Sequence, residues 1–82
     1  MTISGYIHAA MASARYKLLY KKTVFGEIPG FRGVWANEHT LEGCRETLQE
    51  VLEEWIVLKL RDRDPLPRVR GRTLTIPAPS RA

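Results

Sequence analysis

The sequence is poor in cysteine: Cys44 is the only one among 82 residues. One thiol cannot form an internal disulfide, which excludes a disulfide-stabilised secreted fold and indicates a reducing compartment. A zinc site is disfavoured too, because Cys44, His8 and His39 are too few ligands and show no CxxC or HxxxH spacing. We therefore expect neither a metal nor another cofactor.

Long apolar runs are also missing. No stretch approaches the roughly 20 residues that a membrane-spanning helix needs, and the N-terminus lacks the basic region and apolar run of a signal peptide. We expect a cytoplasmic protein without membrane contact. At 44% hydrophobic and 27% charged, the 82 residues indicate one small globular domain. Its limited core favours a homo-oligomer, a dimer or tetramer.

Residues suited to catalysis are sparse as well. A nucleophilic Cys44 would need a base, but His39 is five residues away and would face elsewhere on a helix. Acid–base catalysis needs two converging carboxylates, and only Glu27 and Glu38 lie on or near the predicted strands. The sequence predicts a protein that is not an enzyme and has no catalytic residues.

The clearest pattern that is present predicts a helix over residues 40–60. Its apolar residues recur every three or four positions and form one stripe: Leu41, Cys44, Leu48, Val51, Leu52, Trp55 and Leu58. Glutamates fall mostly on the opposite side, and Thr40 is placed to cap the first turn. We expect the stripe to cover a sheet, with Trp55 supplying a large part of the core.

Before this helix, the sequence predicts a short helix and three strands. Residues 3–14 have apolar residues at helical spacing, with Ser4 as the cap. Alternation predicts strands over residues 15–21, 24–28 and 33–37, and their spacing suits an antiparallel meander. The fold class is therefore α+β.

The C-terminal part is rich in proline and arginine. Pro65 and Pro67 end the helix, residues 73–76 predict a short added strand, and residues 77–82 are expected to be disordered. One domain thus spans residues 1–76.

The net charge of +4 comes entirely from residues 61–82, which hold six arginines and two aspartates. Such a segment can attract phosphates, and Arg68, Arg70 and Arg72 are its candidate nucleic-acid-binding residues. No aromatic residue lies among these arginines to stack on bases, which favours a merely solvated tail.

Aromatic residues are more plentiful along the strands than one buried face requires. Core packing accounts for most of them, but one or two should remain on the second face of the sheet as anchors for a partner. Glu27 is the acid beside the constrained Pro29-Gly30 turn. The candidate partner-binding residues are Tyr20, Phe25, Glu27, Trp35 and Glu38.

The run GEIPGFRGVWA over residues 26–36, followed by TLEGC over residues 40–44, resembles the HicB-like antitoxin family. The shared pattern is a strand, a Pro-x-x-x-Gly turn, a second strand, and Thr-Leu-Glu-x-(Ala/Cys) opening an amphipathic helix. The likeness covers about residues 15–67. It implies a degraded ribonuclease H-like fold, a sheet backed by helices, without nuclease activity.

The resemblance also implies a function. Members typically neutralise a small HicA-type toxin, which cleaves messenger RNA, by covering its active site. Many carry a C-terminal DNA-binding domain, but the 15 residues after Pro67 are too few for one, as in a short single-domain member. An acidic helix face and Glu27 would complement a basic toxin. The alternative is a nucleic-acid-binding module that uses the arginine-rich segment.

Overall fold

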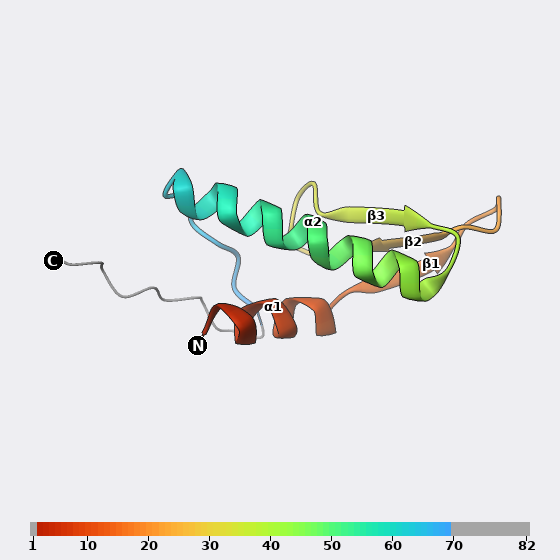
Figure 1. Cartoon of the computed structure of the whole chain (residues 1–82), viewed down its shortest axis with the longest axis horizontal. Helices are drawn as coiled ribbons and strands as arrows, with labels where there is room; N and C mark the ends of the chain where they lie inside the picture. The colour runs from red at the N-terminus through yellow and green to blue at the C-terminus, as the bar shows by residue number, and fades with distance from the viewer. Residues whose placement is uncertain (1, 70–82) are drawn as a thin grey trace, which may run out of the picture.

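The computed structural model describes residues 2–69 and has two helices and three strands (Figure 1). In chain order they are α1 (Ile3–Ala12), β1 (Arg15–Leu18), β2 (Val24–Glu27), β3 (Trp35–Glu38) and α2 (Leu41–Arg61). The strands form one antiparallel sheet in the order β1-β2-β3. The predicted α+β meander is therefore confirmed. The expected added strand at 73–76, the tail at 77–82 and the domain end at 76 lie outside the described residues.

The sheet has two different faces. Cross-strand neighbours are Arg15, Glu27 and Trp35 in one row, and Tyr16, Gly26 and Ala36 in the next. Since successive residues point to opposite faces, these rows alternate between the two sides. Gly26 and Ala36 are buried against α2, which packs on β2 and β3. We call this side the inner face; the other side, the open face, carries Arg15, Lys17, Phe25, Glu27, Trp35 and Asn37.

The core lies where α1, α2 and the β2–β3 loop meet. Its buried members are Tyr6, Ala10, Ile28, Phe31, Val34, Ala36, Cys44, Leu48, Leu52, Ile56 and Val69. The Tyr6 hydroxyl donates a hydrogen bond to the Pro67 carbonyl, which ties α1 to the segment after α2. The loop thus contributes more of these buried apolar side chains than the strands do, because four-residue strands offer few inward positions.

The expected apolar stripe of α2 is right in its middle and wrong at its ends. The buried residues follow a spacing of four and are Cys44, Leu48, Leu52 and Ile56. Leu41 is 53% exposed and Leu58 is 47% exposed, whereas Ile56 was missing from the predicted stripe. A 21-residue helix is about 30 Å long, but four-residue strands span only about 13 Å. The C-terminal part of α2, which carries Leu58, therefore extends past the strands (Figure 1).

Trp55 is not the centre of the core. It is only partly buried; its ring packs 5.2 Å from that of Phe31, and the Lys59 ammonium lies 5.1 Å from the Trp55 ring. Tyr6, fully buried, takes the central place. The expectation for Trp55 is thus corrected, because the β2–β3 loop and α1 supply the large side chains.

Local hydrogen bonds set the element boundaries. The Thr40 hydroxyl accepts from the Gly43 N–H at 2.9 Å, as predicted, while Thr2, not Ser4, caps α1. β1 ends at Leu18 and not at residue 21, because the Leu19 N–H donates to the Thr23 carbonyl at 2.7 Å and closes a turn. The predicted strands were therefore too long at this hairpin.

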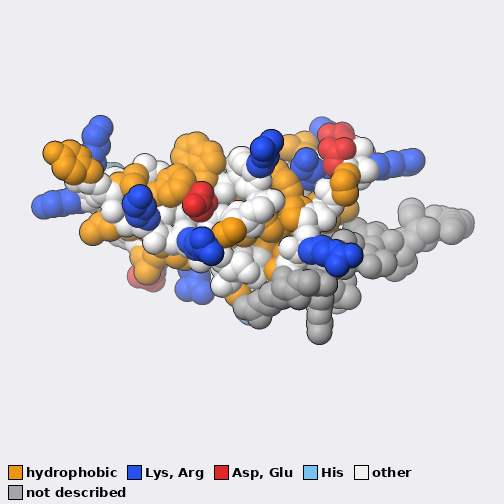
Figure 2. Space-filling view, turned by 180° about the vertical axis from the view of Figure 1, so that it is seen from behind, with side chains coloured by type: hydrophobic (Ala, Val, Ile, Leu, Met, Phe, Trp, Pro, Cys, Tyr) orange, Lys and Arg blue, Asp and Glu red, His pale blue; other side chains and the backbone are white. Residues whose placement is uncertain are grey.

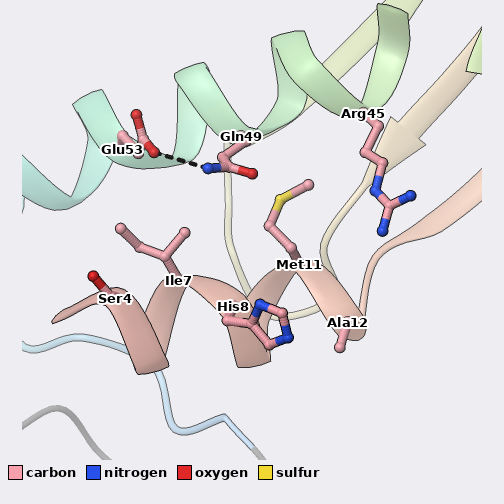
Figure 3. A pocket seen from close by; sticks show the side chains of 8 residues that line it. All are labelled: Ser4, Ile7, His8, Met11, Ala12, Arg45, Gln49 and Glu53. Carbon is pink, nitrogen blue, oxygen red and sulfur yellow. Dashed lines mark hydrogen bonds between the residues drawn. The ribbon is translucent and has the colours of Figure 1, made fainter. Parts of the chain in front are cut away.

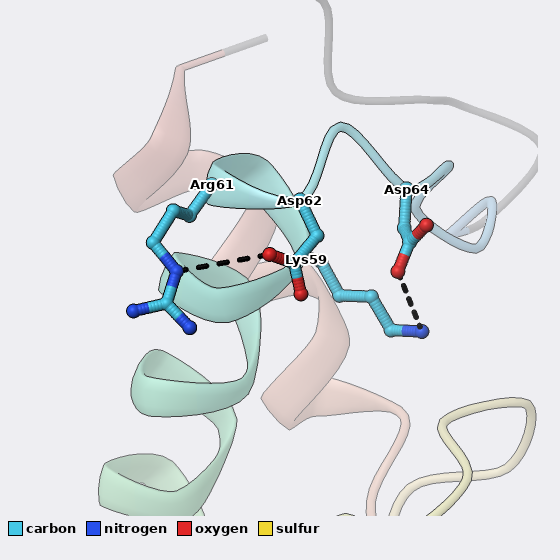
Figure 4. A network of polar contacts seen from close by, with 4 residues as sticks. All are labelled: Lys59, Arg61, Asp62 and Asp64. Atoms are coloured by element: carbon cyan, nitrogen blue, oxygen red, sulfur yellow. Dashed lines mark ion pairs between the residues drawn. The ribbon is translucent and has the colours of Figure 1, made fainter.

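The C-terminal end of α2 carries two solvent-accessible ion pairs (Figure 4). Lys59 lies 3.8 Å from Asp64, and Arg61 lies 3.7 Å from Asp62. Exposed pairs of this kind contribute little to stability. The chain reverses here mainly through backbone hydrogen bonds, including one from the Asp64 N–H to the Lys59 carbonyl at 2.9 Å.

Candidate functional site

The structure brings three of the five predicted partner-binding residues together. Phe25, Glu27 and Trp35 share the open face. Tyr20 lies apart from them at the β1–β2 hairpin tip and is fully exposed. Glu38 belongs to the inner side, where its carboxylate accepts a hydrogen bond from the Thr47 hydroxyl at 3.1 Å. The five residues therefore do not form one surface.

An aromatic pair marks the centre of the open face. The Phe25 and Trp35 rings are stacked, with centroids 6.0 Å apart and an interplanar angle of 24°. Trp35 is 55% exposed, so the sheet presents a large, oriented ring to solvent. A hollow of about 570 Å³ adjoins the pair; it is lined by Arg15, Phe25, Glu27, Arg32, Trp35 and the β2–β3 loop.

The charge around this aromatic pair is basic. Arg15 and Lys17 lie on β1, and Arg32 joins them from the β2–β3 loop, whereas Glu27 is the single acid of the open face. Figure 2 shows this side of the molecule, with blue Lys and Arg side chains around orange apolar ones. Arg15 lies directly opposite Glu27 across the strands. Glu27 is therefore surrounded by basic side chains, and this part of the sheet is a poor site for a basic toxin.

A second surface lies on the outer side of α2. Its glutamates recur at three or four residues, a spacing that places them on one side of a helix. We call this set the acidic strip: Glu42, Glu46, Glu50 and Glu53, all exposed. No lysine or arginine occurs between Arg45 and Lys59. A shallow hollow of about 250 Å³ runs along it, and the Gln49 amide donates to the Glu53 carboxylate there at 3.0 Å.

The acidic strip ends in an exposed apolar patch. Val57 is 62% exposed and Leu58 is 47% exposed. With Glu53 and Glu54 they line a hollow of about 380 Å³. Apolar residues beside a polar rim are the usual anatomy of a protein–protein interface. The sequence pattern missed this patch because it assigned Leu58 to the buried stripe.

A groove separates α1 from the acidic strip (Figure 3). It encloses about 250 Å³ and is lined by Ser4, Ile7, His8, Met11, Ala12, Arg45, Gln49 and Glu53. α1 contributes mainly apolar side chains, and α2 contributes the polar ones. The strip is therefore bordered by α1 and not covered by it.

A family model described as UPF0150-like matches residues 5–67 of the chain. The chain belongs to the UPF0150-like family. Among solved structures, it is similar to the crystal structure of TTHA0281 from Thermus thermophilus, with 35% identity over 94% of this chain and 96% of that chain and a TM-score of 0.86. No curated protein matches the chain. Membership is compatible with the small antitoxin-like protein that the sequence resembles.

The lone cysteine of this UPF0150-like chain serves packing. Cys44 is fully buried and its thiol donates to the Ala36 carbonyl at 3.6 Å. Burial raises the pKa of the Cys44 thiol, and the nearby Glu38 carboxylate raises it further. The thiol therefore stays protonated at neutral pH, which is the form suited to the core and not to nucleophilic attack.

Within residues 2–69, no three His, Cys, Asp or Glu side chains gather as a metal site would require. No helix in the same part of the chain combines the length and the apolar character needed to cross a membrane. Of the three candidate nucleic-acid-binding arginines, Arg68 is exposed, whereas Arg70 and Arg72 lie outside the described residues.

Register explains which residues the sequence did not reveal. The sequence pattern placed Arg15 and Lys17 on a strand and Arg32 in a loop, but it did not indicate that they lie near one another. Their proximity to Phe25 and Trp35 follows from the pairing of β1 with β2 and from the fold of the β2–β3 loop. The alternation of side chains along a strand divides its residues into two sets, one for each face of the sheet. It does not show which set of one strand shares a face with which set of the next, because that depends on the register.

Proposed function

We propose that this UPF0150-like chain is a non-enzymatic antitoxin of the HicB-like type, which binds and masks a HicA-type toxin that cleaves messenger RNA. The observation that carries the proposal is the acidic strip of α2 together with its apolar end, Val57 and Leu58. The resemblance of residues 15–67 to HicB-like antitoxins and the UPF0150-like membership support it.

The charge of the acidic strip fits such a partner. A protein that holds RNA presents basic side chains to the phosphates. Carboxylates four residues apart on a helix recur about every 6 Å, so the strip offers a row of anions to the same basic side chains. Complementary charge speeds encounter and fixes orientation. Val57 and Leu58 would supply the apolar contact that charge pairs at the rim do not.

This proposal moves the toxin contact from the sheet to the helix. The expected anchors Phe25 and Trp35 have basic neighbours, Arg15 and Arg32, which would repel a basic protein. Between Arg45 and Lys59, α2 itself carries no lysine or arginine. The outer side of α2 is therefore the better site for the toxin.

Co-expression of the chain with the small reading frame beside its gene, followed by affinity purification, tests the proposal. We expect a basic RNA-cleaving protein to co-purify. Reversal of two strip charges, Glu46→Lys with Glu50→Lys, should abolish the co-purification. The matched control, Asp62→Lys with Asp64→Lys, changes the net charge equally but acts after the end of α2, where it replaces two surface ion pairs by like-charge neighbours. The proposal would be refuted if both variants retained the partner equally well, or if no basic protein co-purified with the wild-type chain.

A further inference from the structure

We propose that the open face of the sheet is a platform for single-stranded nucleic acid, separate from the acidic strip. The face combines an exposed aromatic pair, Phe25 and Trp35, with basic side chains around it. Proteins that bind single strands without strong sequence preference use this combination of stacking rings and a positive groove.

The aromatic pair is suited to stacking. Phe25 from β2 holds the Trp35 ring of β3 at an interplanar angle of 24°, so the ring is oriented before any ligand arrives. More than half of Trp35, 55%, remains exposed and available to a base. A duplex hides its base faces, whereas a single strand can splay its bases onto such a ring. The geometry thus favours unpaired nucleotides.

Basic residues border the pair on two sides. Arg15 and Lys17 lie on β1, across β2 from Trp35, and Arg32 lines the adjoining hollow of about 570 Å³ together with Arg15. Glu27 opposes them as the single acid of the face. Lys21 and Lys22 extend the basic surface to the exposed hairpin tip beside Tyr20. A phosphate backbone that runs along β1 would meet these cations while its bases reach the rings.

Charge decides between the two classes of partner for this face. A basic toxin is repelled by Arg15, Lys17 and Arg32, whereas a polyanion is attracted. The arginine-rich segment lacks aromatic residues between its arginines, but the sheet supplies them. Four-residue strands span about 13 Å, so the platform accommodates roughly two or three stacked bases.

Fluorescence anisotropy with labelled oligo(U) RNA and oligo(dT) DNA of about 12 nucleotides tests this proposal. The full chain should bind at least one of them, and binding should weaken between about 50 and about 200 mM salt. Trp35→Ala should weaken binding at least about fivefold through lost stacking. Arg15→Gln with Lys17→Gln should lower the slope of log affinity against log salt by about 1.4. Glu27→Gln should strengthen binding.

Tryptophan fluorescence supplies a matched control. Quenching by the bound strand should disappear in Trp35→Phe and persist in Trp55→Phe, because the partly buried Trp55 belongs to α2 and packs against Phe31. Failure to bind either oligonucleotide, preference for a duplex, or unchanged binding by Trp35→Ala would overturn the proposal. The proposal would also be overturned if deletion of residues 70–82 abolished binding while Trp35→Ala had no effect, because the arginine-rich segment would then be the binding site. Circular dichroism should show Trp35→Ala folded, since the side chain is exposed.

Discussion

The Cys44 sulfur lies directly over Gly26 of β2. A Cβ added to Gly26 would stand 2.9 Å from that sulfur and 3.0 Å from two carbons of the Tyr16 ring. Real Cβ atoms do not approach other atoms this closely, so only glycine permits the observed distance between α2 and the sheet. The contact joins α2 to the middle strand of the sheet.

Gly26→Ala should destabilise the protein by about 1–3 kcal/mol, as overpacking of a core does. The added methyl must displace Cys44 or the more mobile ring of Tyr16. In the Cys44→Ala background the same change should cost clearly less, because the vacated sulfur volume accepts the methyl. Urea unfolding of the four proteins in this cycle measures the coupling. Additive effects, or a Gly26→Ala protein as stable as the wild type, would contradict the predicted packing.

Removal of the α2 cap should destabilise the protein by about 1 kcal/mol, as is typical for a threonine cap. Thr40→Ala removes the hydroxyl that accepts from the Gly43 N–H at 2.9 Å. Thr40→Ser keeps the hydroxyl and should lose little. Thermal and urea unfolding of the two variants give the comparison, and equal losses would show that the hydroxyl is not what stabilises the helix start.

Stability should decline at alkaline pH. Burial raises the pKa of both Cys44 and Tyr6 above their ordinary values. The unfolded chain therefore releases these protons at lower pH than the folded chain does. The stabilisation is complete below the unfolded pKa, about 8.5 for cysteine and about 10 for tyrosine, and is lost as pH rises through the folded values.

Urea unfolding at about pH 7, 9 and 10.5 measures this decline. Cys44→Ala should remove the decline in stability that begins near the cysteine pKa, and it should leave the decline that begins near the tyrosine pKa. Tyr6→Phe should do the reverse, with an added loss at every pH from the missing hydrogen bond to the Pro67 carbonyl. A wild type whose stability is flat to about pH 10 would contradict the burial of Cys44, and one that stays flat to about pH 10.5 and beyond would contradict the burial of Tyr6 as well.

We propose that the homo-oligomer expected from the small size of the chain forms through the inner side of β1. α2 packs on β2 and β3, and Leu18 of the edge strand β1 remains 72% exposed. Leu18→Lys should therefore shift the protein toward the monomer in sedimentation equilibrium. Val57→Lys, an equal change at another exposed apolar residue, should leave the assembly intact. A monomeric wild type, or the reverse pattern, would contradict this.

The elements of the fold follow from local patterns. Thr40 with its apolar stripe fixed the start and type of α2, and alternation revealed all three strands. The errors have a common cause, since periodicity describes a helix or strand in isolation. It does not show that the C-terminal part of α2 extends past the strands, where Leu58 stays exposed, or that α1 and the β2–β3 loop fill the core in place of Trp55.

The candidate sites were harder to foresee. Phe25 and Trp35 were identified as surplus aromatics, but their neighbours Arg15 and Arg32 come together only through strand register and loop folding. Glu38 looked equivalent to Glu27 in the sequence. In the sheet, however, Glu38 pairs with Val24, which lies three residues before Glu27 on β2, so the two glutamates point to opposite faces. Surfaces built from several elements depend on tertiary contacts, which single-element patterns do not contain.

The most direct measurement of the central claim is an RNA-cleavage assay with the basic toxin that we propose as the partner of this chain. We predict that cleavage stops as the chain approaches a one-to-one ratio, that Glu46→Lys with Glu50→Lys fails to stop it, and that Asp62→Lys with Asp64→Lys still does. Undiminished cleavage in the presence of excess wild-type chain, or equal protection by the strip variant, would contradict the assignment of α2 as the surface that masks a toxin.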